Sequence, residues 1–230
     1  MGDDPRGRSG REGILYFGAV GAGLSHELSN VFNIINELAG LQQDIVAAAA
    51  QGGAAGLARV SDLAARIKAQ VVRGEEINRS LHRLSHSVDE PDGSFDLGET
   101  LILFGSLAAR VARLAEVAFE VRPPETPMAH RGDPFALLLV LHGCLRAAIA
   151  AAASERRIEV SAEEGPGGAR VIVSSADPIS DLNSDAAIAE MLVVGCAALA
   201  VVPRLERAPG GGYLIVLNLG PESTEPRSSG

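Results

Sequence analysis

The sequence contains no tryptophan, and only 3% of its 230 residues are aromatic. A folded chain of this kind must build its core from aliphatic side chains, and apolar residues make up 47% of the sequence. This fraction excludes a mostly disordered protein, and the length suffices for one large domain or two small ones. The many alanine, leucine and valine residues favour helices packed on helices.

Positive charge and cysteine are also scarce. The 20 lysine and arginine residues are outnumbered by 29 acidic residues, which gives a net charge of −9. A nucleic-acid-binding surface needs clustered lysine and arginine to replace phosphate counterions, so we expect no nucleic-acid partner. The two cysteines, Cys144 and Cys196, lie in apolar runs, where we expect reduced, buried thiols.

Long apolar segments are missing as well. The longest apolar run, residues 191–202, is shorter than the roughly 20 residues that span a bilayer. Residues 1–6 lack the apolar core of a signal peptide, and Arg6 stands where a myristoylation signal has Ser or Thr. We therefore expect a cytoplasmic protein that does not contact a membrane.

Two long amphipathic helices are predicted in the first part of the chain. Residues 13–50 contain no proline, and their apolar residues recur mainly every three or four positions, as does a second stripe over residues 57–88. Gly52 and Gly53 separate the two helices. We predict a helical hairpin over residues 12–90, after a flexible tail over residues 1–11. Because an isolated hairpin cannot cover its apolar seams, a second copy is expected to complete a dimeric four-helix bundle.

The remainder of the chain predicts an α/β sandwich over residues 94–220, followed by a flexible tail over residues 221–230. The overall class is therefore α+β. Asp133 is a predicted N-cap, because Pro134 fits the first turn of the apolar helix that follows. The expected elements are a helix over 95–118, a short strand over 118–121, a loop over 123–131, a helix over 133–154, strands over 157–162 and 170–174, a helix over 186–201 and a strand over 212–217.

His26 is the main candidate functional residue. It lies in the middle of the first helix but off the apolar stripe, so it should face solvent. Glu27 follows directly, and a carboxylate close to an imidazole can take its Nδ1 proton and leave Nε2 as a nucleophile. Asn30 lies one helical turn further on the same face, where its amide can position a water or a phosphoryl oxygen. A His-Glu pair alone, however, is more often an ordinary exposed histidine.

The residues around His26 closely resemble the H-box helix of sensor histidine kinases. The similar segment runs over residues 17–30 and continues to residues 36–38, and in this family His-Glu-x-x-Asn surrounds the phosphorylated histidine. Val31 replaces the proline that often follows this asparagine. Residues 95–97, Phe-Asp-Leu, resemble the start of the family's ATP-binding domain. The resemblance covers nearly the whole chain and implies that His26 is a phospho-acceptor.

The same resemblance implies that the nucleotide site is degenerate. The family's Mg²⁺-binding asparagines are replaced by Gly143 and Ala147, whose side chains offer no oxygen to a hard cation. Ser175 stands where the family has the aspartate that reads adenine. The segment of the glycine-rich lid, residues 180–201, contains only Gly195. We expect little or no ATP affinity and no cofactor or metal bound by this chain, with Mg²⁺ supplied by the partner.

These observations predict a histidine phosphotransferase of a two-component phosphorelay, similar to dimeric phosphotransferases derived from histidine kinases. His26 would shuttle a phosphoryl group between the aspartates of response-regulator receiver domains. Three alternatives stay open: a response-regulator phosphatase using Asn30, an atypical histidine kinase with a divergent ATP site, and a non-catalytic module that sequesters a regulator. The expected receiver-binding residues lie near His26 and on the second helix: Ser25, Ser29, Phe32, Arg79 and Arg83.

The other histidines and the glycine-rich turn have simpler interpretations. His82 and His86 have the i, i+4 spacing of metal ligands, but no third ligand is evident beyond Asp89, so solvated side chains are favoured. His142 is expected to pack in a helix flank and His130 to lie in a loop. Residues 165–168 join two predicted strands and precede no helix, so they predict a hairpin turn rather than a phosphate-binding loop.

Overall fold

The computed structural model describes residues 5–50, 57–89, 93–153, 156–165, 167–179, 181–182, 185–209 and 211–220. The chain forms two compact units. Ala19–His82 form the first, here called the hairpin unit. Met1–Gly18 and Arg83–Gly230 form the second, here called the sandwich unit. These boundaries differ from the predicted domains because the beginning of the first helix groups with the sandwich unit.

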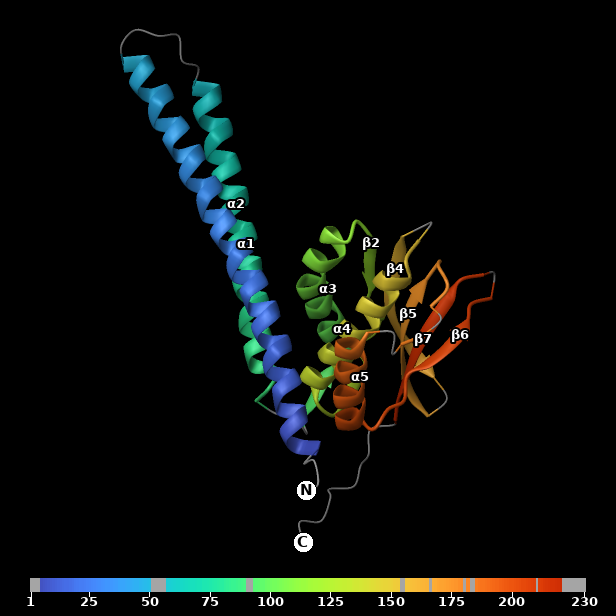
Figure 1. Ribbon diagram of the computed structural model, residues 1–230. Coiled ribbons are helices and arrows are strands. Elements are labelled where there is room, and N and C mark those ends of the chain that lie inside the picture. Colours follow the sequence, from blue (N-terminus) through green and yellow to red (C-terminus); the bar gives the residue numbers. More distant parts are fainter. Residues whose placement is uncertain are drawn as a thin grey trace. The chain divides into compact units, whose positions relative to one another are not determined.

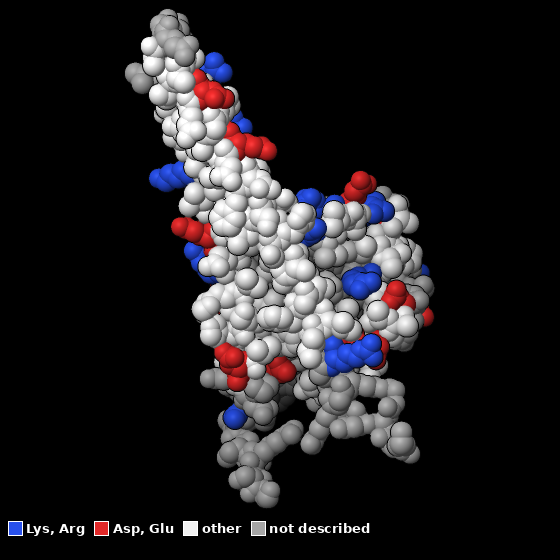
Figure 2. All heavy atoms as spheres, turned by 60° about the vertical axis from the view of Figure 1, so that its left-hand side comes forward, with Lys and Arg blue, Asp and Glu red and all other residues white. Residues whose placement is uncertain are grey.

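Two long helices pair in the hairpin unit, as the apolar periodicity predicts. Helix α1 spans Pro5–Ala50 and α2 spans Leu57–His86. Residues 5–11, which we predicted as part of a flexible tail, are helical, since proline is tolerated in a first helical turn. Figure 2 shows acidic and basic side chains interspersed along the hairpin. Between the helices lies an aliphatic cluster of Leu38, Ile45 and Leu63, with Ile34, Val60 and Ile67 packed against it.

The sandwich unit has three helices on one face of a five-stranded sheet (Figure 1). The strand order is β2-β4-β5-β7-β6, in which β2 and β4 are parallel and the other pairs antiparallel. The α+β class is thereby confirmed. The helices are α3 (Leu97–Leu114), α4 (Pro134–Ala151) and α5 (Ala186–Leu199), and the strands are β2 (Ala118–Arg122), β4 (Arg157–Gly165), β5 (Gly168–Ser175), β6 (Arg204–Arg207) and β7 (Tyr213–Leu219).

Helix α4 is the central helix of the sandwich unit. By length and composition it is the one described helix that could cross a membrane, but 61% of it is buried inside the protein. Its N-terminus is capped as predicted, because Asp133 Oδ1 accepts a hydrogen bond from the Ala136 N–H at 3.0 Å. Asp96 caps α3 in the same way through the Glu99 N–H at 2.8 Å, so that helix begins at Leu97 rather than at Phe95.

Three short strands were not predicted. β1 (Ser94–Asp96) and β3 (Ala129–Arg131) form a separate two-stranded sheet, and the second of these lies inside the predicted loop. His130 is therefore a buried strand residue, in edge-to-face contact with Phe95 at 5.5 Å between ring centroids. Edge strand β6 is exposed along its whole length and lacks the apolar alternation that indicates a strand.

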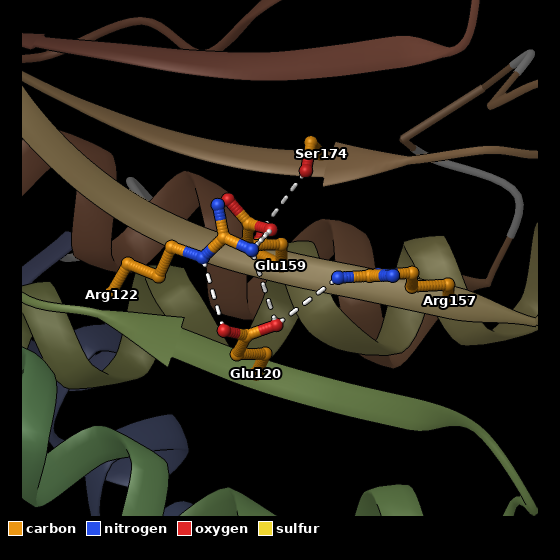
Figure 3. Close-up of polar contacts among 5 residues, drawn as sticks. All are labelled: Glu120, Arg122, Arg157, Glu159 and Ser174. Atoms are coloured by element: carbon orange, nitrogen blue, oxygen red, sulfur yellow. Dashed lines mark hydrogen bonds and ion pairs between the residues drawn. The ribbon is translucent and has the colours of Figure 1, made fainter.

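The sheet face opposite the helices carries a network of arginine and glutamate side chains (Figure 3). Arg122 lies 3.0 Å from both Glu120 and Glu159, and Arg157 lies 3.2 Å from Glu120. The hydrogen bond and charge of Arg122 hold the pKa of the Glu120 carboxyl below its usual range. Charged cross-strand pairs of this kind suit a solvated sheet face.

Candidate functional site

His26 lies on the solvent-facing side of α1 in the hairpin unit. Its side chain is exposed, as predicted, while Leu24 and Val31 are buried. Asn30 is also exposed and stands one turn further along the helix, so both side chains share one face. The helix is continuous through this region, in keeping with the absence of proline. This arrangement leaves the imidazole accessible to a macromolecular partner.

Glu27 faces α2 rather than solvent. Its side chain is 18% exposed, and its Oε2 lies 3.9 Å from Nη2 of Arg73. Consecutive helix residues do not face each other, so the carboxylate points away from the side of the helix that carries His26. The sequence pattern does not reveal Arg73 as a partner of Glu27, because the register of two antiparallel helices is not evident from either helix alone.

Gly74 also lies against α1. A Cβ atom at this position would lie 3.4 Å from Cγ1 of Val31 and 3.7 Å from Cδ1 of Leu28. The part of α2 that lies opposite the His26 turn is therefore centred on Arg73 and Gly74. The predicted partner residues Arg79 and Arg83 lie further along α2.

The predicted receiver-binding residues are only partly brought together. Ser25, Ser29 and Phe32 are exposed on α1 close to His26, and the Ser29 hydroxyl donates a hydrogen bond to the Ser25 carbonyl at 3.0 Å. Arg79 is exposed on α2. Arg83, by contrast, belongs to the sandwich unit, where its Nη2 lies 3.0 Å from Oε2 of Glu99.

Helix α5 covers the face of α4 on which the family resemblance places the metal-binding asparagines. A Cβ atom on Gly143 would lie 3.0 Å from Cδ2 of Leu192. On the facing helix, a Cβ atom on Gly195 would lie 2.5 Å from Cγ2 of Val140. The two glycines thus allow the helices to approach closely, and aliphatic side chains fill the space between them.

The segment around Ser175, where the resemblance places the adenine-reading aspartate, is a buried turn. The Ser175 hydroxyl oxygen accepts a hydrogen bond from the Asp177 N–H at 3.2 Å. Asp177 is only 4% exposed, and its Oδ2 accepts hydrogen bonds from the N–H groups of Ala153 at 2.8 Å and Arg156 at 3.4 Å. This carboxylate therefore binds backbone groups at the end of α4.

The two cysteines are buried free thiols, as predicted. Burial raises the pKa of the Cys196 thiol to about 11 and raises that of Cys144 further. Nδ1 of His86 lies 2.6 Å from Oδ2 of Asp89. Within the described ranges, no three His, Cys, Asp or Glu side chains converge to form a metal site.

The first turns of α1 pack against α4 within the sandwich unit. Tyr16 is 2% exposed, and its ring centroid lies 5.1 Å from that of His142 and 5.6 Å from that of Phe135. His142 therefore packs in a helix flank, as predicted. Burial, with a smaller effect of the Arg146 charge, lowers the pKa of His142 to about 4.

Because of this buried histidine, we expect the stability of the sandwich unit to fall at acidic pH. The pKa of His142 is about 4 in the folded protein and near 6.5 in the unfolded chain, so between these values the unfolded chain binds the extra proton. Well between the two pKa values, stability should fall by up to about 1.4 kcal/mol for each pH unit that the pH is lowered. Urea unfolding of the native chain and of His142→Gln, measured from pH 7 to pH 4.5, checks this. Equal pH slopes in the two proteins would contradict it.

No family model and no curated protein matches this chain. Among solved structures, it is similar to the ATP-binding domain of PrrB from Mycobacterium tuberculosis, with 18% identity over 58% of this chain and 99% of that one, and a TM-score of 0.47. The catalytic domain of histidine kinase ThkA matches with 17% identity, 56% and 96% coverage, and a TM-score of 0.45. Histidine kinase AdeS of Acinetobacter baumannii matches with 15% identity, 84% and 98% coverage, and a TM-score of 0.43.

Proposed function

We propose that this chain is a histidine phosphotransferase of a two-component phosphorelay. His26 takes a phosphoryl group from the aspartyl phosphate of one receiver domain and passes it to the aspartate of another. The observation that carries this proposal is the exposed His26 on a continuous helix, with Asn30 one turn away on the same face, inside a segment that resembles the H-box. A solvent-facing imidazole is what transfer between proteins requires.

The chemistry needs little from this chain beyond the nucleophile. The Nε2 lone pair of His26 attacks phosphorus while the bond from phosphorus to the aspartate oxygen breaks, and the carboxylate leaves with that electron pair. The Nδ1 proton leaves to water, and the reverse steps deliver the phosphoryl group to the second aspartate. The aspartyl phosphate and Mg²⁺ belong to the receiver domain. Asn30 is proposed to position a phosphoryl oxygen.

The packing of α5 on α4 supports transfer that does not use ATP. Where an ATPase of this type needs oxygen ligands for Mg²⁺, Gly143 faces Leu192. Asp177 lies near the place of the adenine-reading aspartate, and its carboxylate already accepts hydrogen bonds from backbone N–H groups. We therefore propose that the sandwich unit is a scaffold and that the phosphoryl group comes from a partner protein in the cytoplasm.

The hairpin unit also supports a second copy as a partner. Large apolar side chains of both helices remain more than two-fifths exposed, although the two helices already pack on each other. Burying them against another hairpin would complete the proposed four-helix bundle. The side chains are Phe32, Leu41, Val46, Val71 and Val72.

A phosphatase is the second candidate function, and the exposure of Asn30 favours it. An amide one turn from His26 could orient water toward the aspartyl phosphate of a bound receiver. In that case Asn30 would be required and His26 would be dispensable. The two functions therefore predict opposite effects for the same pair of substitutions.

The test uses the full chain and receiver domains from the same genome, phosphorylated with labelled acetyl phosphate and Mg²⁺. We expect acid-labile label on the native protein, none on His26→Ala, and label on Asn30→Ala. If the receiver instead releases its label as free phosphate, and if Asn30→Ala but not His26→Ala abolishes this release, the chain acts as a phosphatase. Label appearing on His26 from ATP alone would contradict the ATP-independent assignment.

A further inference from the structure

We propose that Arg73 of α2 is a positioning residue for phosphoryl transfer at His26. It acts by holding the Glu27 carboxylate in place and by offsetting its negative charge. This inference rests on the proposed function, since it concerns how the same site admits a phosphoryl group. Arg73 does not contact the phosphoryl group in this proposal. It contacts the carboxylate of Glu27, the residue that follows the nucleophile in sequence.

The geometry pairs a guanidinium of α2 with the carboxylate of the residue that follows the reacting histidine. Oε2 of Glu27 lies 3.9 Å from Nη2 of Arg73, and both residues belong to the hairpin unit. The Glu27 side chain is 18% exposed, whereas that of Arg73 is 50% exposed. The carboxylate is therefore largely covered, whereas the guanidinium is half exposed to solvent.

Gly74, the next residue, lies against α1 at the same level. A Cβ atom at this position would lie at ordinary van der Waals distance from Val31 and Leu28, so the two helices pack on each other here. This packing brings the guanidinium of Arg73 within reach of Glu27. The pair thus depends on the packing of the two helices at the level of the reactive turn.

The electrostatic consequence follows from the charge of the incoming group. A phosphoryl group carries close to two negative charges, and the residue after His26 carries another. Like charges repel, and the repulsion is stronger when the docked partner has displaced water. The positive charge of Arg73 offsets the carboxylate, so the phosphoryl group approaches Nε2 of His26 against a smaller barrier. Without Arg73 this offset is lost.

An exposed ion pair can also be present with little consequence, since such pairs contribute little to stability. That alternative and the proposed role predict different behaviour. A structural pair would leave the transfer rate unchanged or alter it only through the folding of the hairpin. A role through Glu27 predicts that removal of the carboxylate makes Arg73 dispensable.

The experiment is a double-mutant cycle on the full chain, measuring the rate at which label passes from a phosphorylated receiver to His26. Arg73→Ala should slow transfer about tenfold, which corresponds to about 1.4 kcal/mol, and Arg73→Lys should remain within about twofold of the native rate. In the Glu27→Gln background, Arg73→Ala should have little further effect. The tenfold deficit should shrink at high salt, because ions screen the same repulsion.

The matched control is Arg66→Ala, which removes an exposed arginine of the same helix two turns away and should leave the rate unchanged. Thermal unfolding of all variants separates a folding defect from a transfer defect. An unchanged rate in Arg73→Ala would overturn the proposal. So would a full tenfold loss in the Glu27→Gln background, since Arg73 would then act on the phosphoryl group directly. If the native protein takes no label at all, the proposed function fails instead.

Discussion

Replacing Gly195 by alanine is expected to destabilise the sandwich unit by about 2 kcal/mol, although alanine is the better helix former. The added Cβ would lie 2.5 Å from Cγ2 of Val140 and 3.0 Å from the Ala136 carbonyl oxygen. The second contact is with backbone inside α4, so the helices must move apart. Overpacking costs up to about 3 kcal/mol, and the gain of about 1 kcal/mol in helix propensity offsets only part of it.

Gly40→Ala is the matched control. A Cβ atom on Gly40, in the interior of α1, would meet no described atom within 4 Å, so this substitution should stabilise its helix by up to about 1 kcal/mol. The two glycine replacements thus have opposite expected signs. Urea unfolding, followed by hydrogen exchange at the amides of each helix, distinguishes them. Stabilisation by Gly195→Ala would show that α5 does not pack closely on α4.

Asp177→Ala is expected to cost about 3 kcal/mol of stability, because it removes a buried carboxylate that accepts two backbone N–H bonds. The N–H groups of Ala153 and Arg156 would lose a charged acceptor at the point where the chain leaves α4 and approaches β4. Asp177→Asn keeps an acceptor oxygen without the charge and should cost less than half as much. Denaturant unfolding of both variants measures the difference, and equal losses would assign the effect to packing instead.

The elements that the sequence predicts well are those with a strong local signal. Asp133 followed by Pro134 marked the start of α4 correctly, and residues 165–168 were correctly interpreted as a hairpin turn, with Gly165 paired with Gly168. The apolar periodicity predicted both hairpin helices. β6 was missed because Arg-Leu-Glu-Arg carries no alternation, and its strand conformation comes from pairing with β7.

The features of the candidate site fall into the same two groups, those with a local sequence signal and those that depend on tertiary contacts. The exposure of His26 and Asn30 follows from their place relative to the apolar stripe, which any single helix reveals. The contact between Glu27 and Arg73 depends on the register of two helices, and the contact of Tyr16 with His142 depends on the tertiary fold. Such contacts join residues far apart in sequence, and periodicity contains no information about them. For the same reason the contact of Arg83 with Glu99 could not be predicted.

The sandwich unit is discontinuous in sequence. The first turns of α1 belong to it, and the residues of the hairpin unit come between those turns and the remainder of the unit along the chain. During synthesis, Phe135 and His142 are therefore made long after Tyr16. The whole helical hairpin is synthesised in the interval and can fold before Tyr16 makes these contacts. Contacts of such long sequence separation form late and slow the completion of folding. A fragment that begins at the predicted boundary, residue 94, would lack these turns and leave part of α4 uncovered. A fragment meant to fold independently should therefore include residues 12–18, joined to Arg83 by a linker that replaces the hairpin unit.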